Sequence, residues 1–189
     1  MKYVFSENNW SLEQFTYAYT YRFEETPVFV QEVDCIRNSK NEEFKQGFDN
    51  ISLMDRTPHG PGTRITTQCA FENFGAPLIV LAESLDTDAR GVLRHGNYFE
   101  IVLYENGINV WRMWLRDGKV SWKKLMNVDF PVSANEVHTL SVQVEADRLR
   151  IEAEGHKMSL YVPDMYPSFY AGINACEEIN RFYSMEIEE

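Results

Sequence analysis

The chain has 189 residues, of which 44% are hydrophobic and 14% aromatic. This is enough for the core of one all-β domain, and we expect a single domain over residues 1–189. The net charge of −11 argues against nucleic acid and anionic membrane as partners, because both bind basic surfaces. The longest apolar runs are only a few residues, so we expect no transmembrane helix.

The start of the chain, MKYVFSENNW, lacks the apolar stretch of a secretory signal, which favours a cytoplasmic location. A chain whose leader had been removed would look the same, so an extracellular location stays open. The cysteines are Cys35, Cys69 and Cys176, an odd number at wide spacing with no CxxC. We expect buried thiols, as in a reducing compartment.

Strand-like runs follow one another along the chain. Phe15–Phe23 places five aromatic residues at alternate positions, with Thr16, Thr20 and Arg22 on the other side. Leu78–Leu81 is apolar without interruption, which is typical of a strand covered on both faces. The other expected strands are Pro27–Ile36, Asn50–Met54, Thr63–Glu72, Pro77–Glu83, His138–Glu145, Arg148–Glu154, Lys157–Val162, Phe169–Cys176 and Arg181–Ile187. Thr57–Gly62 is expected to break a strand, and only Asn41–Phe48 and Ser133–Val137 suit a helical turn.

The segment Asn97–Leu125 predicts three strands joined by turns at Glu105-Asn106-Gly107 and Asp117-Gly118. A three-residue first turn, with Gly107 in the left-handed position, would pair Tyr104 with Ile108. One face would then be apolar and form core: Phe99, Ile101, Leu103, Trp111, Met113 and Leu115. The opposite face would carry Tyr98, Glu100, Arg112 and Trp114.

About a dozen short strands with almost no helix predict an all-β jelly-roll sandwich of two antiparallel sheets. The order of parts resembles the concanavalin A-like lectin/glucanase superfamily over roughly Tyr3 to Ile187. The matching segments are GNYFEIVLYENGINVWRMW, Val137–Ile151 and GHKMSLYVPDMYPSFYAGINACEEINRFYSMEI. The resemblance implies the fold and leaves the function open, since the superfamily contains sugar binders and hydrolases.

In that superfamily one sheet is concave, and ligands lie on it or on its rim loops. The resemblance therefore makes Tyr98, Glu100, Arg112 and Trp114 candidates for a sugar-binding surface. Sugar C–H faces stack on aromatic rings, and sugar hydroxyls bond to planar polar groups. The alternative is a structural role, with Glu100 and Arg112 as a cross-strand ion pair.

Trp122 joins these candidates if the Asp117-Gly118 turn has three residues, which would pair it with Arg112 and expose it. A two-residue turn would pair Trp122 with Met113 and send it to the core. A second candidate cluster lies where the strand Phe169–Cys176 ends and consists of Asn174, Glu177, Glu178, Asn180 and Arg181, of which Asn174, Glu177 and Arg181 are the candidate ligand-binding residues. Its alternative is a solvated turn between the last two strands.

A glycosidase needs two carboxyl groups across one bond, about 5–5.5 Å or about 6.5–9.5 Å apart. Retaining glucanases of the superfamily carry the pattern E-x-D-x-x-E. Glu32-Val33-Asp34 begins that way, but Arg37 replaces the third acid, so we expect ordinary strand-surface acids there. Glu100 with Glu177 remains a possible catalytic pair.

Asp86–Gly91 resembles the start of a calcium loop, but Arg90 and Asn97 stand where oxygen ligands are required, which predicts a polar hairpin tip. The four histidines lack zinc-ligand spacing, so we expect neither metal nor cofactor. The leading hypothesis is a non-catalytic, lectin-like domain whose partner is carbohydrate. The alternatives are a glycosidase using Glu100 and Glu177, or a protein-interaction domain. A monomer is expected, or a weak dimer if the Phe15–Phe23 stripe lies uncovered on an edge strand.

Overall fold

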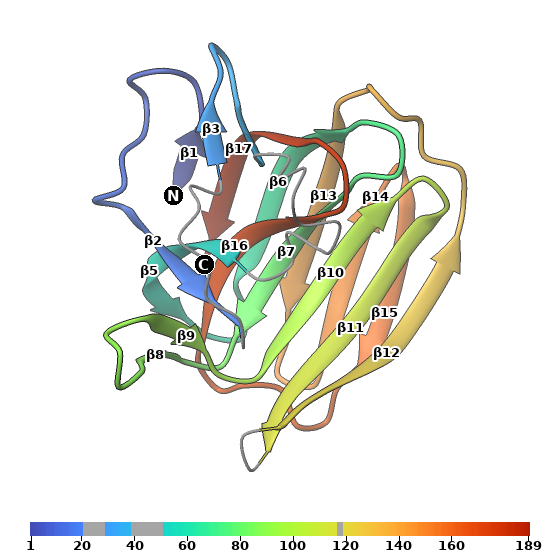
Figure 1. The fold of residues 1–189 in the computed structure, drawn as a ribbon. Helices are drawn as coiled ribbons and strands as arrows, with labels where there is room; N and C mark the ends of the chain where they lie inside the picture. The colour runs from blue at the N-terminus through green and yellow to red at the C-terminus, as the bar shows by residue number, and fades with distance from the viewer. Residues whose placement is uncertain (21–28, 39–50, 117–118) are drawn as a thin grey trace.

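The computed structural model describes residues 1–20, 29–38, 51–116 and 119–189. Those residues form seventeen strands in two sheets and no helix. Within these ranges no helix is long and apolar enough to cross a membrane. The two sheets face each other as a sandwich, with β10–β12 lying in front of β13–β15 in Figure 1. The predicted fold class is therefore confirmed.

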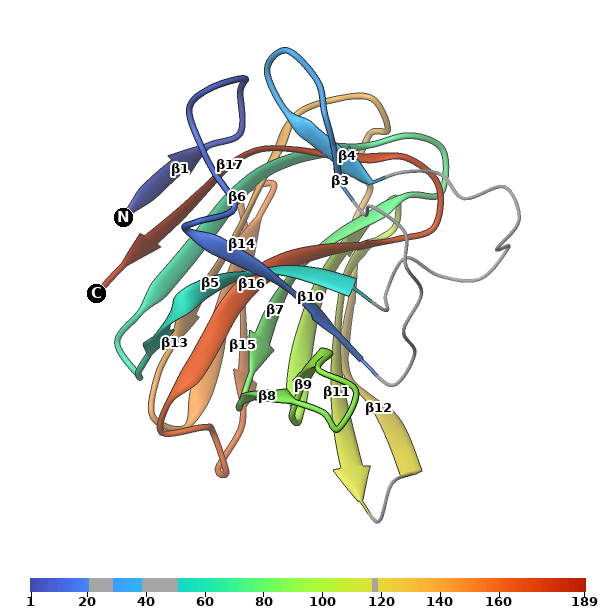
Figure 2. The same ribbon diagram turned by 60° about the vertical axis from the view of Figure 1, so that its left-hand side comes forward.

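The eight-stranded sheet has the order β15 (His156–Tyr161), β14 (Arg148–Ala153), β13 (His138–Val144), β6 (Arg64–Phe71), β17 (Asn180–Glu188), β4 (Ile36–Asn38) and β3 (Phe29–Gln31), with β1 (Lys2–Val4) also paired to β17. The nine-stranded sheet has the order β12 (Lys119–Asp129), β11 (Gly107–Arg116), β10 (Tyr98–Tyr104), β7 (Ala76–Ala82), β16 (Phe169–Cys176), β5 (Ile51–His59), β2 (Phe15–Tyr19), β9 (Leu93–His95) and β8 (Leu85–Thr87). Every pairing is antiparallel except a single parallel contact between β2 and β9. The two termini lie side by side because β1 pairs with β17 (Figure 2).

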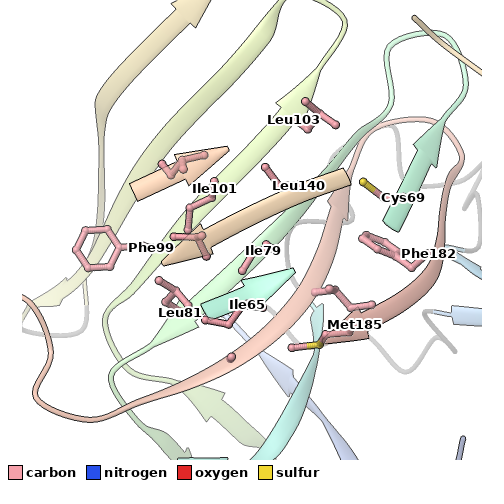
Figure 3. Close-up of a cluster of buried hydrophobic side chains, with 14 of the residues drawn as sticks. Ile65, Cys69, Ile79, Leu81, Phe99, Ile101, Leu103, Leu140, Phe182 and Met185 are labelled. Atoms are coloured by element: carbon pink, nitrogen blue, oxygen red, sulfur yellow. The ribbon is translucent and has the colours of Figure 1, made fainter. Parts of the chain in front are cut away.

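The main core fills the space between the sheets. It combines side chains of both layers, such as Phe99 and Leu103 from β10 with Leu140 from β13 (Figure 3). Every residue of β7 is buried, and β7 lies between β10 and β16 in the middle of its sheet. The prediction that Leu78–Leu81 is covered on both faces is confirmed.

The aromatic stripe at the start of the chain faces this core. Phe15 is fully buried, and Tyr17 and Tyr19 pack against the core cluster. Their strand β2 lies between β5 and β9, so the alternative of an uncovered stripe on an edge strand is excluded for these residues. The remaining aromatic positions of the stripe, Tyr21 and Phe23, lie outside the described residues.

Some strand boundaries differ from the predicted ones. In the predicted strand Pro27–Ile36, the described part from Phe29 onward belongs to a hairpin of β3 and β4, because the Gln31 amide closes a turn by donating to the carbonyls of Glu32 and Cys35 at 2.6 and 3.0 Å. Glu32 and Asp34 therefore lie in a turn and not on a strand surface. β5 continues through Pro58 to His59, where a bulge in its pairing with β16 accommodates the missing N–H.

The hairpin of β8 and β9 has the polar tip that was predicted. The Asp88 carboxylate accepts hydrogen bonds from the backbone N–H groups of Arg90 and Val92 at 2.8 and 3.0 Å. The bond from Val92 is the main reason that the pKa of Asp88 falls to about 2. Asn41–Phe48 lies outside the described residues, and Ser133–Val137 forms no helical turn.

Two of the three cysteines are buried as expected. Burial raises the pKa of Cys69 to about 12, and burial together with the Glu32 carboxylate does the same for Cys35. Cys176 is only half-buried, at the end of β16. The first two thiols therefore serve as small packing groups.

A mutant pair tests the packing of β10 and β11. Leu103 is fully buried, so Leu103→Ala should lower the free energy of unfolding by about 2–5 kcal/mol. Leu115, which was predicted to share its face, is 49% exposed, and Leu115→Ala should cost no more than about 0.5 kcal/mol. Urea unfolding measures both variants. Equal losses would mean that both side chains lie in the core.

A series of polar contacts joins Tyr3 of β1 to Glu189 through two buried residues of β5, Asp55 and His59. The Tyr3 hydroxyl donates to Asp55 Oδ2 at 2.6 Å, and His59 lies 3.7 Å from Asp55 Oδ1 and 3.2 Å from Glu189 Oε1. Burial opposes both charges, but the mutual contacts prevail. The pKa of Asp55 is therefore lowered and that of His59 is raised.

These shifts predict a stability optimum in mildly acidic solution. The Asp55 contribution is lost as the pH falls through the lowered pKa of Asp55, and the His59 contribution is lost as the pH rises through the raised pKa of His59. Glu189→Gln removes one of the groups that raise the pKa of His59. Its deficit relative to the unmodified protein should be largest near pH 6 and shrink toward pH 8. Melting temperatures across that range measure it, and a constant deficit would contradict the linkage.

Candidate functional site

The open face, by which we mean the side of the nine-stranded sheet turned away from the other sheet, has an apolar floor. A second cluster of buried side chains forms it, and all its members come from the nine-stranded sheet. Leu78 and Val80 of β7, Tyr98 and Val102 of β10, and Met113 of β11 occupy its centre. Apolar walls with a few polar groups are typical of ligand sites.

The turn between β10 and β11 decides which side chains reach the open face. Tyr104 pairs with Gly107, so the loop has only two residues, Glu105-Asn106. Gly107 has a φ of 126°, and a Cβ there would lie 2.0 Å from the Val128 carbonyl oxygen. Only glycine fits at this close approach. The predicted three-residue turn, which paired Tyr104 with Ile108, is therefore wrong by one residue.

A shift of one residue exchanges the two faces of a strand. Trp111 pairs with Glu100 and Met113 pairs with Tyr98, so both lie on the open face. The core prediction is thus confirmed for Phe99, Ile101 and Leu103, and wrong for Trp111, Met113 and Leu115.

Trp122 lies on the same open face. It pairs with Met113, as the two-residue form of the second turn requires. That pairing was expected to bury Trp122 in the core, which is wrong because Met113 itself lies on the open face. The indole is 39% exposed.

A cleft of about 600 Å³ opens over the ends of β7, β10, β11 and β16. Its lining combines aromatic rings, carboxylates, amides and small groups: Phe74, Tyr104, Trp111 and Trp122; Glu100, Glu105 and Glu177; Asn106 and Asn109; Ala76, Val102 and Cys176. Of the predicted site residues, Glu100, Trp122 and Glu177 line this cleft. Tyr98 is buried in the floor beside it.

Two tryptophans of the cleft, Trp111 of β11 and Trp122 of β12, come from adjacent strands at the sheet edge. Trp111 of β11 carries Lys124 of β12 over its ring, with Nζ 4.9 Å from the ring centroid. This cation–π contact fixes the indole and covers part of its surface with an ammonium group. A bulge between Val110 and Trp111 marks the same position in the pairing of β11 with β12.

The carboxylates of Glu100 and Glu177 occupy different parts of the cleft, the floor and the rim. Glu100 is 7% exposed and lies in the floor, in register with Val80 of β7 and Trp111 of β11. Glu177 is exposed in the turn after β16, where its φ of 53° is unfavourable for a residue with a side chain. Asn180 Nδ2 holds that turn by donating to the Glu177 carbonyl at 2.9 Å. Glu177 is therefore a rim residue presented by a strained turn.

The sequence analysis missed Glu105, for which a signal existed. Glu100-x-Val102-x-x-Glu105 has the spacing of the first and last acids in the E-x-D-x-x-E pattern, with Val102 at the middle position. Trp111 and Tyr104 were missed because the predicted register turned Trp111 inward and no ligand role was assigned to Tyr104.

Arg112 and Trp114 lie on the inner face of β11, so their predicted place beside Glu100 is wrong. Arg112 is 7% exposed, and its Nη1 donates to both carboxylate oxygens of Asp164 at 2.8 Å. Its guanidinium lies 4.8 Å from the Phe99 ring centroid and 5.1 Å from that of Trp114. The hydrogen bond from Arg112 lowers the pKa of Asp164. Arg112 thus fastens the loop before β16 to β11.

The second predicted cluster is divided. Arg181 lies on the eight-stranded sheet, where its Nε donates to Glu32 at 3.0 Å and its Nη1 to Glu72 at 2.7 Å, away from the cleft. Asn174 is 1% exposed, and its Oδ1 accepts from the Ala175 N–H at 2.7 Å. Only Glu177 of the predicted cluster lines the cleft. In the described part of the chain, no group of three or more His, Cys, Asp or Glu residues could hold a metal ion.

No protein-family model matches the sequence, and no curated protein matches it. Among solved structures, the carbohydrate-binding module CBM66 from Bacillus subtilis is similar, with a TM-score of 0.64 and 12% identity, over 85% of this chain and 91% of that chain. A glycoside hydrolase family 16 endo-glucanase from Bacteroides ovatus, in complex with G4G3G-2F-DNP, has a TM-score of 0.64 and 10% identity, over 100% and 99% of the two chains. LamA from Z. galactanivorans, in complex with laminaritriose and laminaritetraose, has a TM-score of 0.64 and 8% identity, over 100% and 98%.

The chain shares the fold of these structures, a jelly-roll sandwich of two antiparallel sheets. The resemblance seen in the sequence is confirmed at the level of the fold. Identities of 8–12% carry no residue roles from these structures to this chain. The function must therefore be argued from the cleft itself.

Proposed function

We propose that this domain binds carbohydrate in the cleft of the open face. The observation that carries the proposal is the combination of Trp111 and Trp122 with carboxylates and amides over an apolar floor. Indole rings stack on the C–H faces of sugars, carboxylates accept hydrogen bonds from sugar hydroxyls, and amides both accept and donate them. The fold supports the proposal, since one similar structure is a carbohydrate-binding module and two hold oligosaccharides or their derivatives.

The ligand we propose is a chain and not a single sugar. A second hollow, of about 620 Å³, adjoins the cleft and shares Tyr104 and Asn106 with it. Phe130 and Pro131 form its apolar side, and Asn127 and Asp129 its polar side. Two hollows joined across one tyrosine suit consecutive units of an oligosaccharide. Affinity should therefore rise with oligosaccharide length.

Neighbouring tryptophans on opposite faces of β11 provide a sharp test. Trp111→Ala should weaken binding roughly tenfold or more, since central aromatic residues concentrate binding energy. Trp114→Ala removes an indole of the same strand that faces away from the cleft, and it should leave affinity within about twofold. Affinity electrophoresis against soluble glucans and galactans, followed by calorimetry on the best ligand, measures both. Greater loss in Trp114→Ala would contradict the site.

A second candidate function is glycoside hydrolysis, which a specific observation favours. Glu100, Glu105 and Glu177 line one cleft, and a glycosidase needs two carboxyl groups there. Glu100 and Glu105 also have the spacing of the outer acids in the glucanase pattern. Val102 occupies the position of the middle acid, which is the reason that this candidate ranks second.

The hydrolase candidate predicts release of new reducing ends from the bound polysaccharide. Glu100→Gln and Glu105→Gln should each abolish release while leaving the fold intact, because each removes a carboxyl group that must act on the bond. Glu83→Gln, an acid that does not line the cleft, is the matched control. Prolonged incubation without new reducing ends, using protein that binds the polysaccharide, would leave binding as the function.

A further inference from the structure

The charged side chains that line both hollows are all acidic in the described part of the chain. Glu100, Glu105 and Glu177 line the cleft, and Asp129 lines the adjoining hollow. No Lys, Arg or His among the described residues lines either one. This separation of charge is local, since the chain as a whole contains 18 Lys and Arg residues against 29 acids.

Two of these carboxylates have amide partners, which do not neutralise their charge. Glu105 Oε1 accepts from Asn106 Nδ2 at 3.3 Å, and Asp129 Oδ1 accepts from Asn127 Nδ2 at 2.6 Å. Tyr104 lines both hollows, and the pKa of its phenol is affected by the negative charge nearby. Burial raises the pKa of its phenol, and the Asp129 carboxylate raises that pKa further.

A described cation beside the cleft is Lys124, whose Nζ lies over the Trp111 ring. Among the described residues, this ammonium lies at the edge strand, whereas the carboxylates of Glu105, Glu177 and Asp129 line the hollows, and the net charge of −11 adds no compensation at longer range. A ligand in the hollows therefore meets a negative potential. Like charges placed against one another disfavour binding, and the opposite charge favours it.

We propose that the cleft selects glycans by charge: it accepts uncharged and amino-bearing chains and rejects sulfated or carboxylated ones. The proposal rests on the proposed carbohydrate function and names the class of its ligand. The selectivity arises because the cleft carboxylates repel anionic glycans, and not because they make an additional favourable contact with the preferred ones. Such repulsion is a common way for a site to achieve specificity. A polyanionic chain spanning both hollows would bring several negative groups against Glu105, Glu177 and Asp129 at once.

The test uses one neutral polysaccharide that the protein binds, converted to three derivatives of equal low substitution. Hydroxyethyl groups control for bulk, carboxymethyl groups add negative charge and aminoethyl groups add positive charge. The carboxymethyl derivative should bind at least about tenfold more weakly than the hydroxyethyl derivative, and the aminoethyl derivative more tightly. The difference should shrink between about 0.01 M and about 1 M salt, where the Debye length falls from about 30 Å to about 3 Å.

Two sets of variants test whether the carboxylates of the cleft cause this charge selectivity. The double variant Glu105→Gln with Glu177→Gln should narrow the ratio of hydroxyethyl to carboxymethyl affinity severalfold, whatever its effect on each affinity alone. Glu152→Gln is the matched control, because Glu152 belongs to β14 of the other sheet and pairs with Arg64 and Lys157 there. It should leave the ratio unchanged.

The outcomes separate this inference from the proposed function. Binding of the carboxymethyl derivative as tight as that of the hydroxyethyl derivative, or ligands found only among sulfated and uronic acid glycans, would overturn the charge selection and leave carbohydrate binding standing. An equal change of the ratio in Glu152→Gln would assign the effect to net charge and overturn the role of the cleft. Failure to bind any glycan by folded protein would overturn both.

Discussion

The close approach of β12 to the start of β11 controls the site. At Gly107 the backbone of the neighbouring strand lies so near that a Cβ would sit 2.0 Å from the Val128 carbonyl oxygen. Glycine is therefore built into the strand, and the turn is left to Glu105-Asn106. Because side chains alternate along a strand, this one position assigns each residue of β11 to its face. Trp111 then meets Glu100, and the cleft follows.

The same register also places a charged side chain on the inner face of β11, where burial is unfavourable. Arg112 lies there, almost fully buried, and a buried guanidinium is strongly unfavourable unless it is paired. Asp164 supplies the charge, and the rings of Phe99, Trp114 and Tyr166 surround the guanidinium at 4.8–5.5 Å. Arg112 thereby holds the loop before β16 against β11. The arrangement that exposes Trp111 therefore also ties the cleft strand to the rest of the sandwich.

Local sequence patterns predicted the layers better than the site. Unbroken burial over Leu78–Leu81 and alternation in β10 depend on periodicity within one strand, and both were predicted correctly. The site depends on which strand neighbours which, and on turn length. Glu105-Asn106-Gly107 suits a two-residue or a three-residue turn equally well, and only the pairing of Tyr104 with Gly107 in the folded sheet distinguishes them.

The predicted rim cluster failed for a related reason. The Arg181 guanidinium donates a hydrogen bond to Glu32, which lies 149 positions earlier in the chain, and it therefore lies away from Glu177. Partners so distant in sequence leave no local pattern. The Glu177 turn is itself supported from far away, since Asn38 donates to the Glu178 carbonyl at 2.8 Å. Spacing along the chain could indicate polar residues near a strand end, but it could not show which of them the fold brings to one cleft.

Val102 separates the two candidate functions physically. It lies between Glu100 and Glu105 in the sequence, belongs to the apolar cluster of the open face and also lines the cleft. A third carboxylate at that position would have to be desolvated in the cluster between two other acids, which is unfavourable without a proton or a cation. An isopropyl group instead continues the apolar floor up to the indoles of Trp111 and Trp122. A floor of this kind holds a sugar face by stacking and exclusion of water, which is what binding requires, whereas bond cleavage needs in addition two carboxyl groups placed on either side of the bond.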